Sequence, residues 1–227
     1  MSSESPKQAL FAQFAAVAKA VAHPHRLELL EQLAQGERSV EVLADRTRLG
    51  VANASQHLQQ MRRAGLVAAR RDGKFVFYRL ADDAVLELLA SVRRIAEHGL
   101  AEVERVVRGY FRNRDSLEPV SRLELMERLK AGIVTVLDVR PEDEFALGHL
   151  PGAINIPLAE LEKRLGDLDP EHEIVAYCRG PYCVLAYEAV AALRVRGFKV
   201  RRLEDGYPEW RAAGMPVETR AVRYLSA

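Results

Sequence analysis

The sequence contains few of the residues that cross-link or anchor a protein. Its 227 residues include two cysteines and one tryptophan. Two cysteines are too few for the disulfide framework of a small secreted domain. No apolar run approaches the roughly 20 residues of a membrane span, and the first residues lack the apolar core of a signal peptide. We therefore expect a cytoplasmic protein with no membrane partner, and the length allows one large or two ordinary domains.

The net charge is also small, but it is unevenly distributed. The whole chain carries +1 at pH 7. Residues 1–115 carry 18 Lys and Arg against 14 Asp and Glu, whereas the remaining residues carry 15 against 18. The sign of this asymmetry favours the first half for any nucleic-acid contact.

Apolar residues in the first half recur every three or four positions, which predicts helices. Residues 8–35 are expected to form two helices divided at Pro24, because proline suits a first helical turn. A short third helix follows Ser39, and a fourth covers residues 52–64. Asp72 and Gly73 then separate two alternating segments, which is a strong hairpin signal. This order predicts a mainly α winged helix-turn-helix fold with a β-hairpin wing.

The helix over residues 52–64 and the hairpin carry side chains suited to DNA. Amides and hydroxyls read base edges, and arginines contact phosphates or guanine. Three cations near one hairpin tip suit a phosphate surface. The alternative is an ordinary solvated helix face. The candidate DNA-binding residues are Asn53, Ser55, Gln56, His57, Gln59, Gln60, Arg62 and Arg63 on the helix, and Arg70, Arg71 and Lys74 on the hairpin.

A long apolar stripe predicts one helix over residues 82–111, which Gly99 kinks or ends. The stripe packs within the chain or forms a dimer seam, and the two are compatible. Residues 113–118 have the composition of a linker. Beyond them, strand-like runs at 134–139, 153–156, 174–177 and 198–203 alternate with helical segments. This pattern predicts an α/β domain with a largely parallel sheet.

Both cysteines lie in one short segment of the second half. An apolar strand-like run precedes it and a helix-like run follows, so Cys178 is expected on a tight strand-to-helix loop. The amides of such a loop and the helix N-terminus favour a thiolate. The alternatives are two inert core cysteines or a structural disulfide, which the absence of a secretory signal disfavours. The candidate active-site loop is Cys178, Arg179, Gly180, Pro181, Tyr182 and Cys183.

The first half resembles the ArsR/SmtB family of bacterial repressors over roughly residues 8–110. The resemblance lies in residues 18–30, which include His23-Pro24-His25-Arg26, and in residues 55–58, 63–67 and 73–78. It implies a DNA-binding and dimerisation domain over residues 1–112, a homodimer joined through its first and last helices, and a palindromic double-stranded operator.

Residues that sense metals in this family are missing. Residues 39–43, on the third helix, contain no cysteine, and the last helix offers only His98 with Asp82, Asp83 and Glu102. One histidine is too few for the usual zinc site. We therefore expect no metal and no other cofactor, and the signal has to enter elsewhere.

The second half resembles a rhodanese over residues 119–219, with residues 220–227 as a tail. The resemblance lies in residues 137–140, Glu144, residues 148–157, the cysteine loop, and residues 203–210 and 214–217. It implies that Cys178 attacks a sulfane sulfur donor and carries the sulfur as a persulfide, which the loop amides hold. Asp138 and Arg140 are expected to be structural, and His149 to pack or hydrogen-bond locally.

The loop also departs from the rhodanese pattern at its sixth position. A cation is common there, whereas this sequence has Cys183, and the loop cation is Arg179. This change weakens the case for fast turnover on thiosulfate. A second thiol can instead attack a modified Cys178, and the alternative is that Cys183 points into the core and does not react.

The sequence thus predicts a dimeric regulator, acting as a repressor, whose operator affinity depends on the sulfur or redox state of Cys178, with Cys183 as candidate resolving thiol. The donor would be thiosulfate, a polysulfide or a low-molecular-weight persulfide. The alternative is a sulfurtransferase enzyme that uses the helix-turn-helix part as a dimerisation device. A metal-responsive repressor ranks last.

Overall fold

The computed structural model describes residues 5–115 and 118–220. Parts of the expected linker and almost all of the expected tail, residues 116–117 and 221–227, therefore lie outside the described residues. The chain divides into two compact units between Ser91 and Val92. This division falls inside a helix, whereas composition places the linker at residues 113–118.

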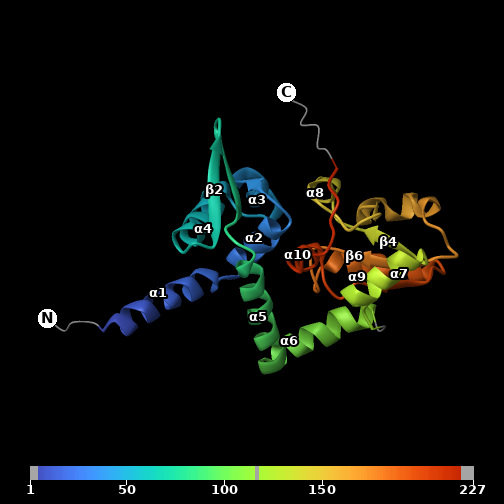
Figure 1. The fold of residues 1–227 in the computed structure, drawn as a ribbon, viewed down its shortest axis with the longest axis horizontal. Helices are drawn as coiled ribbons and strands as arrows, with labels where there is room; N and C mark the ends of the chain where they lie inside the picture. The colour runs from blue at the N-terminus through green and yellow to red at the C-terminus, as the bar shows by residue number, and fades with distance from the viewer. Residues whose placement is uncertain (1–4, 116–117, 221–227) are drawn as a thin grey trace. The chain divides into compact units, whose positions relative to one another are not determined.

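The first unit is a helical bundle with a three-stranded antiparallel sheet (Figure 1). The sheet order is β1-β3-β2, and β2 and β3 form the predicted hairpin. Gly73 closes its turn with a φ of +56°, a conformation that glycine adopts without strain. The elements are α1 (Pro6–Val21), α2 (Pro24–Ala34), β1 (Arg38–Ser39), α3 (Val40–Arg46), α4 (Val51–Arg63), β2 (Val67–Asp72), β3 (Phe75–Leu80) and the first half of α5 (Ala84–Gly99).

Helix starts in this unit follow the expected local chemistry. Ser5 caps α1, and its Oγ accepts a hydrogen bond from the Gln8 amide at 3.3 Å. Pro24 occupies the first turn of α2, as predicted, and the Ser39 side chain caps α3. The helices bury a shared apolar core, whose fully buried members include Leu29, Leu30, Leu43, Leu58 and Met61.

The single helix expected over residues 82–111 is interrupted. The helix α5 ends at Gly99, Leu100 is extended, and the chain continues as α6 (Ala101–Val106) and the π-helix η1 (Val107–Arg112). Much of the apolar stripe stays uncovered, because Ile95, Leu100 and Val106 are all more than half exposed.

The second unit contains a parallel four-stranded sheet of order β5-β4-β6-β7, as the sequence predicted. Its strands are β4 (Val134–Asp138), β5 (Ile154–Asn155), β6 (Glu173–Tyr177) and β7 (Val200–Arg202). Its further helices are α7 (Arg122–Ala131), α8 (Glu142–Leu147), α9 (Val184–Val195) and α10 (Tyr207–Ala212), with 3₁₀ turns η2 (Leu158–Lys163) and η3 (Leu165–Asp167).

Alternate residues of the central strands supply two separate cores. Ile174 and Ala176 of β6 pack with α9, whereas Val175 and Tyr177 pack with the cluster that contains Trp210 of α10. A strand points successive side chains to opposite faces, so both faces of this sheet are covered. This arrangement places the end of β6 and the start of α9 at one edge of the sheet. In the described part of the chain, no helix is long and apolar enough to cross a membrane.

Candidate functional site

Helix α4, the second helix of the predicted helix-turn-helix and here called the recognition helix, exposes most of the predicted DNA-contacting side chains. Its buried residues are Ala54, Leu58 and Met61, which fix the helix against the core. Ser55 and His57 are partly buried. The exposed candidates are Asn53, Gln56, Gln59, Gln60, Arg62 and Arg63.

A groove of about 720 Å³ separates the recognition helix from the hairpin. It brings together five of the predicted residues from two elements, four of them arginines. The lining residues are Gln59, Arg62, Arg63, Ala69, Arg70, Arg71, Val76 and Tyr78. Lys74 is exposed at the hairpin turn. Concentrated positive charge on one face suits a polyanion.

The two hairpin arginines differ in whether acidic neighbours already pair with them. Arg70 donates to Glu37 at 2.6 Å and to Asp72 at 3.1 Å, and these hydrogen bonds raise the pKa of its guanidinium. Arg71 is exposed and forms no ion pair within residues 5–115 and 118–220. Arg71 is therefore the stronger candidate for a phosphate contact.

His57 faces the first turn of α2 rather than the exposed side of the recognition helix. Its ring lies 4.6 Å from His23 and 6.0 Å from His25 between centroids. Burial lowers the pKa of His57, and the nearby His23 lowers it further. The His57 ring therefore belongs to a cluster of three histidines with His23 and His25.

The second candidate site is the loop between β6 and α9. The structure joins Cys178 and Cys183 in a disulfide, with their Cα atoms 6.0 Å apart. Both belong to the apolar core beneath α9, and Cys183 occupies the N-cap position of that helix without a side-chain capping hydrogen bond. The strand-to-helix loop is therefore formed as predicted, and the two thiols lie within bonding reach of each other.

The buried carboxylate of Glu144 also anchors the loop. Arg179 donates from Nε and Nη2 to the Glu144 carboxylate at 2.8–3.1 Å. Glu144 is fully buried at the start of α8. The Arg179 side chain is therefore held in place by the Glu144 carboxylate.

The backbone of the turn at Gly206 packs directly against the backbone of the loop. A side-chain carbon at Gly206 would lie 2.3 Å from the Gly180 nitrogen and 2.4 Å from the Arg179 carbonyl carbon. The Tyr207 amide also donates to the Cys178 carbonyl at 3.0 Å. Only glycine permits this approach, and it fixes the loop's position.

Tyr182, inside the loop, contacts the helical segment that precedes the sheet. Its hydroxyl donates to Glu97 at 2.8 Å, and its ring lies 5.0 Å from that of Phe111. Burial raises the pKa of Tyr182 to about 12, and the hydrogen bond to the Glu97 carboxylate contributes to this rise. The phenol is therefore neutral and a donor at pH 7.

Asp138 and Arg140 form a buried ion pair at the end of β4. Their side chains are fully buried and 2.6 Å apart, and Arg140 also donates to the Gly148 carbonyl at 2.7 Å. Burial opposes the charge on Arg140, but Asp138 overrides it and raises the pKa of the guanidinium. This geometry suits the structural role expected from sequence.

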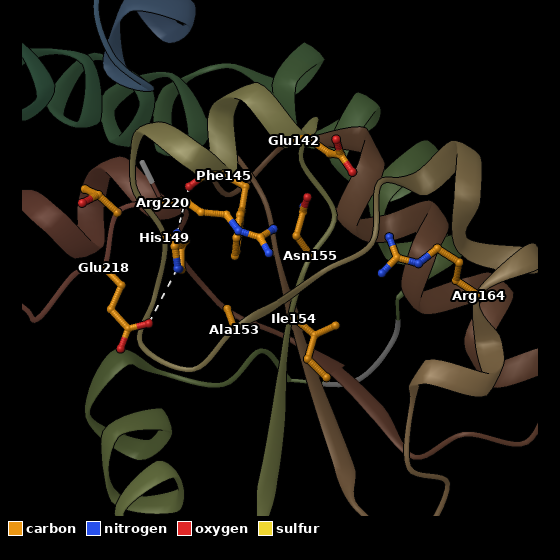
Figure 2. A pocket seen from close by; sticks show the side chains of 10 residues that line it. Glu142, Phe145, His149, Ala153, Ile154, Asn155, Arg164, Glu218 and Arg220 are labelled. Atoms are coloured by element: carbon orange, nitrogen blue, oxygen red, sulfur yellow. Dashed lines mark hydrogen bonds and ion pairs between the residues drawn. The ribbon is translucent and has the colours of Figure 1, made fainter. Parts of the chain in front are cut away.

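His149 lines a separate, open cavity of about 580 Å³ (Figure 2). Its ring stacks on Phe145 at 3.7 Å, its Nδ1 lies 2.8 Å from the Phe145 carbonyl, and Glu218 lies 3.6 Å from its Nε2. The residues that line this cavity include neither cysteine. His149 therefore packs locally, away from the disulfide.

Three contributors to the loop were not identified from sequence. Glu144 belonged to the recognised motif without an assigned partner, and the motif was its only signal. Gly206 likewise lay in the motif at residues 203–210 without an assigned partner. Glu97 carried no signal, because its contact joins residues far apart in the chain.

Comparisons with known proteins cover both halves. The family model described as rhodanese-like domain matches residues 121–213, and the one described as helix-turn-helix domain matches residues 21–70. The HTH-type transcriptional regulator Rv0324 of Mycobacterium tuberculosis is 46% identical over 215 residues, which cover 95% of this chain and 94% of that protein.

Two further similarities each concern one half. A sulfurtransferase of Allochromatium vinosum is 29% identical over 85 residues, covering 37% of this chain and 78% of that protein. The solution structure of the homodimeric winged helix-turn-helix DNA-binding domain of Mb0332 from Mycobacterium bovis is 44% identical, with a TM-score of 0.40, and the match covers 44% of this chain and 94% of that one.

The similarity to Rv0324 runs through the groove-forming half and the disulfide-bearing half alike. The chain therefore belongs to the family of HTH-type transcriptional regulators in which an ArsR-type winged helix-turn-helix domain precedes a rhodanese-like domain.

Proposed function

We propose that this regulator is a repressor whose operator affinity is set by the sulfur or redox state of Cys178. The observation that carries the proposal is the Cys178–Cys183 disulfide. These are the only cysteines of the chain. A disulfide is rare in a reducing compartment unless it is transient or regulatory, so a bond at this position suits a sensor.

The proposed chemistry oxidises the two thiols with a sulfane sulfur donor. The Cys178 thiolate attacks the outer sulfur of a persulfide R–S–SH, which forms Cys178–S–SH and releases R–S⁻. The Cys183 thiolate then attacks the Cys178 sulfur, which forms the disulfide and releases HS⁻. The two cysteines lose two electrons and the sulfane sulfur gains them, so the steps balance. A polysulfide or thiosulfate can serve as donor in the same way.

The proposed DNA contact uses the exposed face of α4 and the arginine-lined groove. The proposed dimer uses α1 and the uncovered apolar stripe. Leu10, Phe11 and Phe14 on α1 are each more than half exposed. Apolar side chains grouped in this way favour an interface. A repressor of this kind acts in the cytoplasm, where its operator is.

The experiment compares operator affinity in two states of the loop. A duplex is first selected from a random library with both the reduced and the oxidised full-length protein. Its affinity is then measured before and after polysulfide treatment for the native protein, Cys178→Ser and Cys183→Ser. We expect a change in the native protein and none in Cys178→Ser. Unchanged affinity in both proteins would sink the proposal.

A second candidate function is catalytic sulfur transfer, which the similarity to a sulfurtransferase favours. Two features of the loop oppose rapid turnover on thiosulfate. Arg179 is occupied by Glu144, and the sixth position is Cys183 instead of a cation. Steady-state thiocyanate formation from thiosulfate and cyanide, lost in Cys178→Ser and without a sequence-specific DNA footprint, would favour the enzyme.

A further inference from the structure

The segment between the two sequence domains contacts the cysteine loop directly. Residues 92–112, here called the connecting segment, comprise the second half of α5 with α6 and η1, and they belong to the second compact unit. Glu97 accepts the Tyr182 hydroxyl at 2.8 Å, and the Phe111 ring packs at 5.0 Å from the Tyr182 ring. Tyr182 is the residue immediately before Cys183, inside the ring that the disulfide closes.

A second set of contacts joins the connecting segment to the elements that hold the loop. Arg93 pairs with Glu209 at 3.4 Å, and Glu209 accepts the amide of Gly206, the glycine that presses on the loop backbone, at 3.1 Å. On the other side, Tyr110 donates to Glu188 of α9 at 3.2 Å. The connecting segment therefore touches the loop, the turn beneath it and the helix that follows it.

We infer that the connecting segment reads the state of the cysteine loop through Tyr182 and passes it to the DNA-binding unit. This inference rests on the function proposed above and names the surface by which that site regulates DNA binding. The disulfide restrains six residues in a small ring that includes Tyr182. When the bond opens, or when a persulfide occupies Cys178, that restraint is lost and Tyr182 changes its contact with Glu97 and Phe111.

The connecting segment is also continuous with the first unit. The first half of α5 contributes Val85 to the core of the helix-turn-helix unit, with Leu86, Leu88 and Leu89 packed against it. Further along the same helix, within the second unit, Arg93 pairs with Glu209 and Glu97 accepts the Tyr182 hydroxyl. A change at Glu97 therefore acts on a helix whose other end is part of the DNA-binding core.

The test uses the full chain in its thiol and disulfide forms. Glu97→Ala removes the acceptor for Tyr182, and Glu97→Gln keeps an acceptor oxygen. Glu102→Ala is the matched control, because Glu102 is an exposed acid of the same segment that pairs only locally with Arg105, at 2.9 Å. Amide hydrogen exchange over residues 92–112 is measured for each protein in both forms, beside operator affinity in both forms.

In the native protein we expect exchange over residues 92–112 to differ between the two forms by about tenfold, the size of one hydrogen bond to a charged group. We expect Glu97→Ala to abolish the difference in exchange and the difference in operator affinity, while Glu97→Gln and Glu102→Ala retain both. Mass spectrometry of the loop peptide checks that the disulfide still forms.

The two measurements separate this inference from the proposed function. If exchange over residues 92–112 is the same in both forms of the native protein, the inference is wrong, even where operator affinity changes. It is also wrong if Glu97→Ala retains the native differences. If exchange changes as expected but operator affinity does not, the contact between the loop and the connecting segment stands, whereas transmission to DNA binding fails together with the proposed sensing function.

Discussion

The ion pair between Glu144 and Arg179 gives the sharpest prediction about the loop. Glu144 is fully buried, and its carboxylate receives three hydrogen bonds of 2.8–3.1 Å from a guanidinium that is 18% exposed. Removing one partner of a buried pair costs about 3–5 kcal/mol, because the other charge is left uncompensated. Glu144→Gln retains one acceptor oxygen and Arg179 reaches some water, so we expect a loss of about 2–3 kcal/mol.

The assay is urea unfolding followed by tryptophan fluorescence. Trp210 is the only tryptophan of the chain and is fully buried in the second unit, so its signal reports that unit alone. With a urea dependence of about 2 kcal/mol per molar, the midpoint should fall by about 1–1.5 M. Weakening the Glu144–Arg179 ion pair should also expose the loop. Faster alkylation of Cys178 in the reduced protein would report this exposure.

The control variant is Glu162→Gln, which removes an ion pair at the surface. Glu162 is 77% exposed and lies 3.2 Å from Arg196. Exposed pairs contribute about 0–1 kcal/mol, so the midpoint should barely move. Equal midpoints for Glu144→Gln and Glu162→Gln would refute the view that a buried carboxylate anchors the loop.

Three further predictions concern other parts of the molecule. Gly206→Ala forces a methyl group against the loop backbone and should lower the free energy of unfolding by about 1–3 kcal/mol, whereas Gly166→Ala, with open space around it, should be nearly neutral in the same urea assay. Arg71→Gln should weaken DNA binding and reduce the slope of log affinity against log salt by about 1, but Arg70→Gln should change the slope less, because acidic neighbours already engage that residue. The lowered pKa of His57, caused first by burial, means that the folded state binds fewer protons than the unfolded state. Stability should therefore fall as pH decreases below 6.5, and NMR titration of the ring should find its pKa below the ordinary value; a value at or above 6.5 would contradict this.

Much of the fold could be predicted because short-range patterns determine it. Asp72 and Gly73 indicate the hairpin turn. Pro24 divides the first two helices because its ring fits the first turn of α2. The parallel strands correspond to short apolar runs that alternate with helical segments, such as residues 174–177. These signals depend on neighbours within a few positions, so one sequence is enough to read them.

The contacts of the cysteine loop could not be predicted in this way. The chain has 33 Lys and Arg and 32 Asp and Glu, and nothing local indicates that Arg179 selects Glu144 among them. The partner of Tyr182 is 85 positions away. Such pairs depend on how strands and helices meet in space, which hydrophobic periodicity does not encode.

The connecting segment shows a different limit of periodicity. The apolar stripe assumed 3.6 residues per turn, but residues 107–112 form a π-helix. The wider turn changes which side chains share a face. Tyr110 and Phe111 are consecutive in sequence, yet both contact the rhodanese-like domain, Tyr110 through Glu188 and Phe111 through Tyr182. The π-helical segment thus places one aromatic ring against the cysteine loop and its neighbour against α9.

The energies involved decide whether so small a contact can regulate DNA binding. The DNA-binding half has no cysteine, so a thiol-dependent signal has to leave the loop, and the covalent route to the first unit is the connecting segment. A tenfold change in operator affinity requires about 1.4 kcal/mol. One hydrogen bond to a charged group contributes about 1.5–3 kcal/mol. The bond between Tyr182 and Glu97 is therefore large enough, if it differs between the thiol and disulfide forms, to account for a regulatory response without a rearrangement of the sheet.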